Sequence, residues 1–100
     1  MLHTVNKSPF ERNGLDSCLR LSKKGSPILL LEDGIYAAMK GTDATAKMEA
    51  AAKDHAIYVL GPDLAARGVK EDRLIDGVSV VDYGGFVDLT VEHGTVQSWL

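Results

Sequence analysis

The chain has 100 residues, of which 45% are hydrophobic and 25% are charged, and its net charge is -3. This length is typical of a single domain over residues 1–100 that buries one core, and we do not expect a second domain. The small negative charge, without a basic excess, argues against direct binding to a nucleic-acid backbone.

Cys18 is the only cysteine, so the chain has neither an internal disulfide nor a Cys-x-x-Cys spacing for zinc or dithiol redox chemistry. No apolar run approaches the roughly 20 residues that a membrane-spanning helix needs. The first residues also lack the regions of a signal peptide. We therefore expect a cytoplasmic protein without membrane association.

The first residues predict a strand, a polar loop and a helix. Leu2–Val5 is short and β-prone, and residues 6–14 collect Asn, Ser, Pro and Gly. Apolar residues then recur at helical spacing over Leu15–Leu19, and Asn13 is the expected N-cap of this helix. This pattern opens a β-α-β unit, in which the loop after the first strand is the default place to look for function.

The next segment predicts the central strand of the sheet. Residues 27–33, PILLLED, contain four consecutive aliphatic residues, which suits a strand that is covered on both faces in a parallel sheet. A short apolar turn over residues 35–40 should follow, and then a helix that starts at Thr42 or Asp43. The residues expected on the buried side of this helix are Ala44, Met48 and Ala51.

The same alternation continues along the chain. Residues 56–60 predict a third strand, residues 63–67 a short helix, and residues 78–82 a fourth apolar strand. In the charged connection between the last two, Leu74 and Ile75 are the expected apolar anchors.

The last segment predicts a helix and an apolar tail. Asp82 is the expected cap of a helix over residues 84–93, which Gly94 ends. Its expected apolar contacts are Phe86, Val87, Leu89 and Val91. Residues 95–100, TVQSWL, are too apolar for a solvated terminus, so we expect an edge strand or a docking segment for another subunit.

Alternating strands and helices at this spacing predict a three-layer α/β/α domain with a mostly parallel sheet of four or five strands, similar to flavodoxin. Fold class alone does not identify a function, because this architecture supports unrelated chemistries.

Cys18 is the candidate nucleophile, but it lies on the same apolar stripe as Leu15 and Leu19. A buried cysteine that packs as a small hydrophobic residue is the more common case. Catalysis would require an accessible sulfur and a stabilised thiolate, for which Arg12 or Arg20 could serve.

Other candidate sites receive less support from the sequence. His3, His55 and His93 lack metal-ligand spacing, and the last two fall at helix ends. Glu32 and Asp33 follow a strand, as in an acidic magnesium pocket, although a helix cap explains them equally well. Residues 6–14 could bind an anion through their backbone amides, but polar loops of this kind are usually only turns.

Several segments in order resemble the DsrH/TusB family of sulfur-relay proteins. They are LHTVNKSPFERN, LDSCLRL, ILLLEDGIYAA, YVLGPDLAARG, VVDYGGFVDLT and VQSWL, and the resemblance runs from Leu2 to Leu100. It implies a DsrEFH-like α/β subunit of a heterohexamer with DsrE-like and DsrF-like sister subunits, or with TusD and TusC in a tRNA-thiolating system. Such complexes pass persulfide sulfur to a small carrier, DsrC or TusE.

The resemblance also bears on the branch and on Cys18. The cysteine in LDSCLRL matches the single cysteine of DsrH-type proteins, which favours dissimilatory sulfur oxidation over wobble-uridine thiolation of tRNA. In DsrE and TusD the principal sulfur-accepting cysteine follows the third strand, where this chain has Gly61, Pro62 and Asp63.

Two roles follow from this resemblance. In the first, Cys18 carries a persulfide with no cofactor or metal, and in the second the chain is a non-catalytic assembly subunit. A phosphoacceptor or nucleotide-binding module is a distant third, because phosphate-binding glycine patterns are missing.

Overall fold

The centre of the molecule is a five-stranded sheet in the order β4-β3-β2-β1-β5, in a computed structural model that describes residues Met1–Leu100. The strands are β1 (Leu2–Val5), β2 (Ile28–Leu30), β3 (Ile57–Leu60), β4 (Val78–Val81) and β5 (Val96–Trp99). Every neighbouring pair is parallel. The predicted α/β fold is confirmed, and β2 is its central strand as expected.

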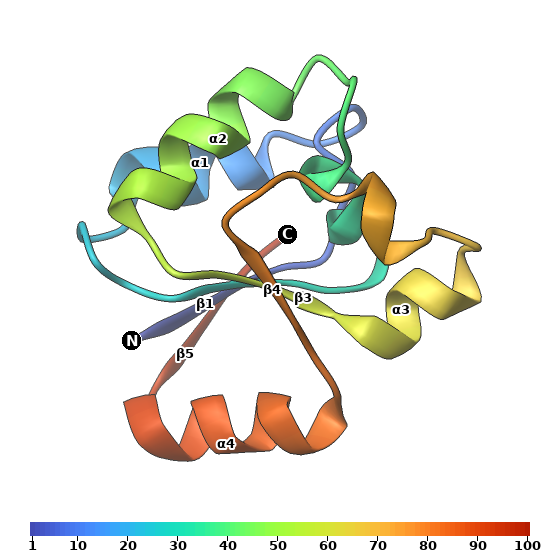
Figure 1. Ribbon diagram of the computed structural model, residues 1–100. Helices are drawn as coiled ribbons and strands as arrows, with labels where there is room; N and C mark the ends of the chain where they lie inside the picture. The colour runs from blue at the N-terminus through green and yellow to red at the C-terminus, as the bar shows by residue number, and fades with distance from the viewer.

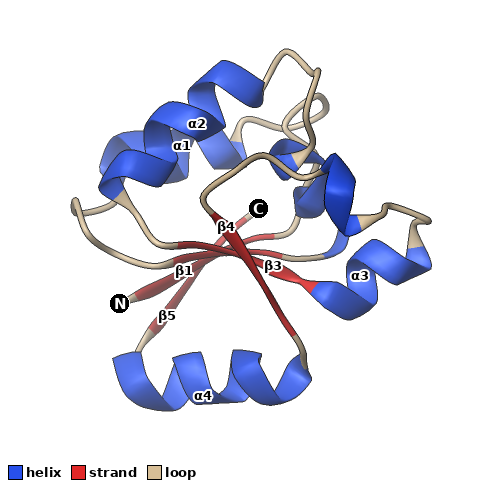
Figure 2. Ribbon diagram, viewed as in Figure 1, coloured by secondary structure: helices blue, strands red, loops and turns tan.

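Helices cover both faces of the sheet because the chain changes direction once. From β1 to β4 the chain steps one way across the sheet, and it then returns past β1 to form β5. Since crossovers between parallel strands are right-handed, α1 and α2 lie on one face and α4 on the other (Figures 1 and 2). The helices are α1 (Gly14–Leu21), η1 (Glu32–Ala38), α2 (Thr45–Asp54), α3 (Gly61–Ala66), η2 (Glu71–Arg73) and α4 (Tyr83–His93), where η marks a 3-10 helix.

The fold resembles flavodoxin in its three α/β/α layers and in its parallel strands. A flavodoxin sheet has the order 2-1-3-4-5, which differs from the order of this sheet. No helix of the structure has the length and apolar character needed to cross a membrane.

Two apolar clusters fill the layers on the two sides of the sheet. The larger lies toward α1 and α2 and includes Val5, Leu30 and Met48, and the smaller joins Leu2 and Leu29 to Leu89 of α4. Alternate residues of one strand thus serve opposite cores, as a sheet covered on both faces requires. The predicted buried residues of α2 and of the charged connection are confirmed: Ala44, Met48, Ala51, Leu74 and Ile75.

The end of β2 differs from the sequence prediction. The strand stops at Leu30, and η1 begins at Glu32, whose φ of 50° is in the left-handed region. The backbone turns here because η1 lies against the end of β1. A Cβ on Gly34 would lie 2.1 Å from the carbonyl oxygen of Val5. Only glycine permits this approach, so the predicted strand over residues 27–33 is too long.

Two helix starts also differ in detail. Asn13 precedes α1 as expected, but its side chain makes no capping bond, because its φ of -97° and ψ of 19° are not extended. Helix α2 begins at Thr45, later than predicted. The Thr42 amide donates to Thr45 Oγ1 at 3.0 Å, and the Ala44 amide donates to Thr42 Oγ1 at 3.1 Å. These two bonds form a turn that delays the helix.

Helix α4 confirms the predicted caps but not all of the predicted contacts. Asp82 accepts a bond from the Gly85 amide at 2.8 Å, and Gly94 ends the helix with a φ of 72°. Leu89 is buried, whereas Val87 and Val91 are 58% and 78% exposed. The prediction for these two valines is wrong because they lie on the side of the helix opposite to Leu89.

Candidate functional site

Cys18 lies in the middle of α1 and faces the core. Its side chain is fully buried in the larger apolar cluster, where Leu15 of the same helix is also buried. The apolar stripe that the sequence indicated is therefore the face of α1 that packs on the sheet. A persulfide donor has no path to this sulfur unless α1 moves.

Burial also suppresses ionisation of the thiol. It raises the pKa of Cys18 to about 11, and the Ser22 side chain one turn later opposes this shift without cancelling it. At pH 7 only about one thiol in ten thousand would be ionised, and the thiolate is the reactive form. Arg12 and Arg20 are exposed and do not contribute to the shift. The geometry thus favours the packing role of Cys18, and sulfur transfer at this residue stays a prediction.

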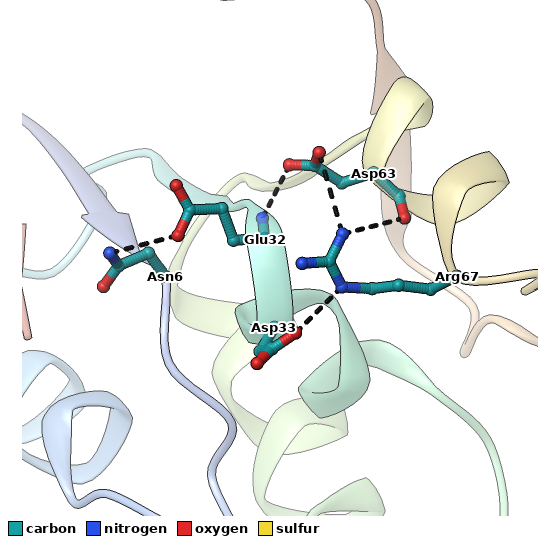
Figure 3. Close-up of polar contacts among 5 residues, drawn as sticks. All are labelled: Asn6, Glu32, Asp33, Asp63 and Arg67. Atoms are coloured by element: carbon teal, nitrogen blue, oxygen red, sulfur yellow. Dashed lines mark hydrogen bonds and ion pairs between the residues drawn. The ribbon is translucent and has the colours of Figure 1, made fainter.

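Polar side chains do meet at the carboxyl ends of β1, β2 and β3, where ligands of α/β sheets commonly bind (Figure 3). The Glu32 backbone amide donates to Asp63 Oδ2 at 2.6 Å, which joins the end of β2 to the start of α3. On the other side, Asn6 Nδ2 reaches Glu32 Oε2 at 3.5 Å. We call this set of five residues, Asn6, Glu32, Asp33, Asp63 and Arg67, the carboxyl-edge cluster.

Arg67 connects the two aspartates of the carboxyl-edge cluster. Its Nε donates to Asp33 Oδ1 at 2.9 Å, and its Nη1 lies 3.9 Å from Asp63 Oδ1. The hydrogen bond to Asp33 is the largest factor that raises the pKa of Arg67. Both carboxylates therefore have a protein partner, and the cluster braces the ends of neighbouring strands.

The structure does not gather the predicted acidic residues into a metal centre. Asp33 pairs with Arg67, and Glu32 lies next to Asn6. No group of three His, Cys, Asp or Glu side chains is placed to hold a metal ion. Glu32 and Asp33 lie in the first turn of η1, but its N-cap residue is Leu31 and no side chain caps it, so the prediction of a helix cap is also wrong for this pair.

Backbone amides of the loop over residues 6–14 donate hydrogen bonds within the loop itself. The Glu11 and Arg12 amides donate to the Ser8 carbonyl at 3.2 and 3.1 Å, and the Phe10 amide donates to Ser8 Oγ. These donors are not free to bind an anion. The structure thus supports the interpretation of residues 6–14 as a simple turn and not as an anion-binding site.

The histidines have structural contacts. His55 is the C-cap residue of α2, as predicted, and its Nδ1 lies 2.8 Å from the Ser26 carbonyl oxygen. His93 is the last residue of α4. His3 is buried in β1, burial lowers its pKa, and its Nδ1 accepts a hydrogen bond from Trp99 Nε1 at 3.1 Å.

Two long-range contacts were not visible in the sequence. The His3–Trp99 bond joins positions 96 residues apart, and the Asp33–Arg67 pair joins positions 34 apart. Only the spacing of Asp63 in α3 and Arg67, its C-cap residue four positions later, gives a local signal for part of the cluster.

Comparison with known proteins identifies relatives of the whole chain. A family model described as DsrH like protein matches residues 7–96. Protein TusB of Pectobacterium parmentieri is 41% identical over 99 residues, which are 99% of this chain and 100% of that protein. Protein TusB of Escherichia coli O1:K1 is 36% identical with the same coverage.

Solved structures share the fold at low identity. The ychN protein of E. coli superposes with a TM-score of 0.79 and 19% identity, covering 97% of each chain. MTH1491 of Methanobacterium thermoautotrophicum, a protein of unknown function, has a TM-score of 0.76 and 17% identity over 97% of this chain and 95% of that one. These likenesses show the fold alone.

Proposed function

The chain belongs to the family of DsrH-like proteins, and we propose that it is an assembly subunit of a sulfur-relay complex of the tRNA-thiolating type. In this role it would hold sister subunits in place while persulfide sulfur passes through their cysteines. The resemblance implies that these sisters are TusD-like and TusC-like, that the assembly is a cytoplasmic heterohexamer, and that a TusE-like protein carries the sulfur onward.

The proposal places the chain in the tRNA-thiolating branch, whereas the presence of Cys18 favoured the sulfur-oxidising branch. Cysteine content favoured sulfur oxidation, with DsrE, DsrF and DsrC as partners. The relatives that match the whole chain are TusB proteins at 36% to 41% identity, and this similarity supports the tRNA-thiolation alternative. A single cysteine is weaker support than similarity over 99 residues, particularly when that cysteine packs in the core.

The burial of Cys18 is the observation that carries the assembly role. It is the only thiol of the chain, it is fully buried, and its pKa is raised to about 11. The resemblance implies that DsrE-like and TusD-like subunits have their principal sulfur-accepting cysteine after the third strand, where this chain has Gly61, Pro62 and Asp63 at the start of α3. Persulfide exchange needs an accessible thiolate, and this chain presents none in its folded state.

Genetic replacement tests the proposal. In the natural host, the chromosomal copy would be replaced by Cys18→Ala, and 2-thiouridine in total tRNA would be quantified by mass spectrometry. Alanine fits an apolar site and removes the sulfur, so we expect thiolation equal to that of the unchanged host. Deletion of the whole chain should abolish thiolation.

Two results would contradict the proposal. Loss of thiolation in Cys18→Ala, with sister subunits still co-purifying, would assign sulfur transfer to Cys18. Normal thiolation after deletion of the chain would exclude the tRNA-thiolating branch.

A further inference from the structure

We infer that a groove between η1, α3 and η2 binds a short acidic segment of a partner protein, with carboxylates against its cationic rim and one apolar side chain on its floor. The groove has a volume of about 550 Å³, which is within the roughly 300–1,000 Å³ of ordinary ligand pockets. It borders the carboxyl-edge cluster, with which it shares Arg67. The inference does not depend on the proposed function.

Backbone contacts fix the walls of the groove. Met39 pairs with Leu74 in an isolated antiparallel bridge, and the Lys40 amide donates to the Arg73 carbonyl at 2.8 Å. These contacts hold the chain after η1 against the end of η2. On the other wall, Val69 packs against the larger apolar cluster. The groove is therefore already formed in the single chain, and a ligand does not have to order it.

The rim of the groove is positive, although the whole chain is negative. The rim consists of three cations and one carboxylate: Arg67, Lys70, Arg73 and Asp72. These residues give the groove a net charge of +2, whereas the chain carries -3. A fourth cation lies beside the groove, because Lys40 Nζ donates to the Asp72 carbonyl at 3.2 Å. The charge of this groove is thus complementary to a negative ligand.

Two of the cations on the rim are free to pair with a ligand. Arg67 is already occupied, since its guanidinium pairs with Asp33 and lies near Asp63 (Figure 3). Lys70 and Arg73 are exposed, and neither takes part in an ion pair of the structure. Carboxylates of a partner would pair with these two side chains, while Arg67 keeps the end of α3 in place.

The floor of the groove distinguishes an acidic peptide from other anions. Tyr36, Met39 and Val69 are half-buried there, so part of their apolar surface stays in water. An inorganic ion cannot cover this surface. A nucleic-acid strand carries charge along its whole length, and beyond the groove it would meet the exposed carboxylates of Glu71 and Asp33. A peptide with glutamates or aspartates on both sides of one apolar residue matches both the rim and the floor.

Fluorescence anisotropy of short labelled peptides tests the chemistry of the ligand on the full chain. The probe is fluorescein-labelled GEELEEG, at an ionic strength of about 0.1 M, where the Debye length of about 10 Å restricts the effect to nearby charges. The counterpart GQQLQQG lacks the charges, and GEEGEEG lacks the apolar side chain. We expect the probe to bind at least roughly tenfold tighter than GQQLQQG and roughly threefold tighter than GEEGEEG, because it alone uses both the rim and the floor.

Charge reversal tests the location of the site. The double variant Lys70→Glu with Arg73→Glu replaces two attractions by two repulsions. An exposed ion pair contributes at most roughly fivefold to an equilibrium constant, so we expect the double variant to bind the probe more weakly by roughly tenfold or more.

The matched control is Arg20→Glu with Lys23→Glu. Both residues are exposed cations without an ion pair near the end of α1, so this variant changes the net charge by the same amount at a different place. We expect it to change the affinity for the probe by less than about twofold. Circular dichroism would verify that both double variants fold.

Three outcomes would overturn the inference. The first is binding of GQQLQQG as tightly as the probe. The second is unchanged affinity for the probe in a folded Lys70→Glu and Arg73→Glu variant. The third is displacement of the probe by a short oligouridylate at a lower concentration than by unlabelled GEELEEG, which would assign the groove to RNA.

Discussion

Replacing Gly34 by alanine tests the close approach of η1 to β1 at the carboxyl edge of the sheet. The added Cβ would lie 2.1 Å from the Val5 carbonyl oxygen and 2.9 Å from the carbonyl carbon. Both are backbone atoms, so no change of rotamer relieves the overlap and η1 must move away from β1. The Leu31 amide, which donates to the same Val5 oxygen at 3.1 Å, would lose its bond.

The cost can be estimated from these two effects. Overpacking of a buried site costs about 1–3 kcal/mol, and the lost hydrogen bond adds about 1 kcal/mol. We expect Gly34→Ala to lower the free energy of unfolding by about 2–4 kcal/mol, which for a domain of this size lowers the Tm by roughly 10–30 °C. Urea denaturation and thermal melting followed by circular dichroism measure these values.

Gly84→Ala is the matched control. Gly84 is exposed in the first turn of α4, and the nearest atom to an added Cβ is Asp82 Oδ1 at 3.4 Å, an ordinary contact. This variant should be neutral or more stable by about 0.5–1 kcal/mol, since alanine restricts the unfolded chain. A Gly34→Ala protein within about 0.5 kcal/mol of the wild type would refute the described packing of η1 on β1.

Three further predictions concern the buried residues Cys18 and His3 and the half-buried Trp99, and urea denaturation measures each. Above pH 9.0 the Cys18 thiol ionises in the unfolded chain, whereas in the folded chain it keeps its proton up to a pH of about 11. The free energy of unfolding should therefore fall by up to about 2–3 kcal/mol over this pH interval, and Cys18→Ala should reduce this decrease. Burial lowers the pKa of His3 below 6.5, so the unfolded chain binds a proton at this imidazole more readily than the folded chain does, and the free energy of unfolding should fall as the pH drops below 6.5. His3→Gln should reduce that loss of stability, and an equal loss in the variant would contradict the prediction. Trp99→Phe removes the bond to His3 and should cost about 1 kcal/mol, whereas Trp99→Ala should cost about 2–3 kcal/mol; no loss in either would mean that the tail is frayed.

The order of the elements and the buried faces were predictable because their signals are local. Four aliphatic residues in a row identified β2 as a strand covered on both faces, and the spacing of Met48 and Ala51 identified the buried side of α2. The caps Asp82 and Gly94 were also readable, since a helix end depends on a few neighbouring residues.

The remaining features depend on contacts between distant positions. Strand β2 ends early because η1 meets Val5, which lies 29 positions before Gly34. The carboxyl-edge cluster forms only when the ends of three strands come together, and its Asp33–Arg67 bond spans 34 positions. For Cys18 the sequence indicated both packing and chemistry, and only the three-dimensional burial of the sulfur separates them.

The most direct test of the assembly role is the location of sulfur in the intact complex. The complex would be purified from the natural host and loaded with a persulfide donor. Mass spectrometry would then quantify added sulfur on the Cys18 peptide and on the cysteine peptides of the sister subunits. The buried thiol predicts sulfur on a sister cysteine and none on Cys18. Sulfur on Cys18 in comparable amount, removable by a thiol reductant, would contradict the assembly role and make this residue a station of the relay.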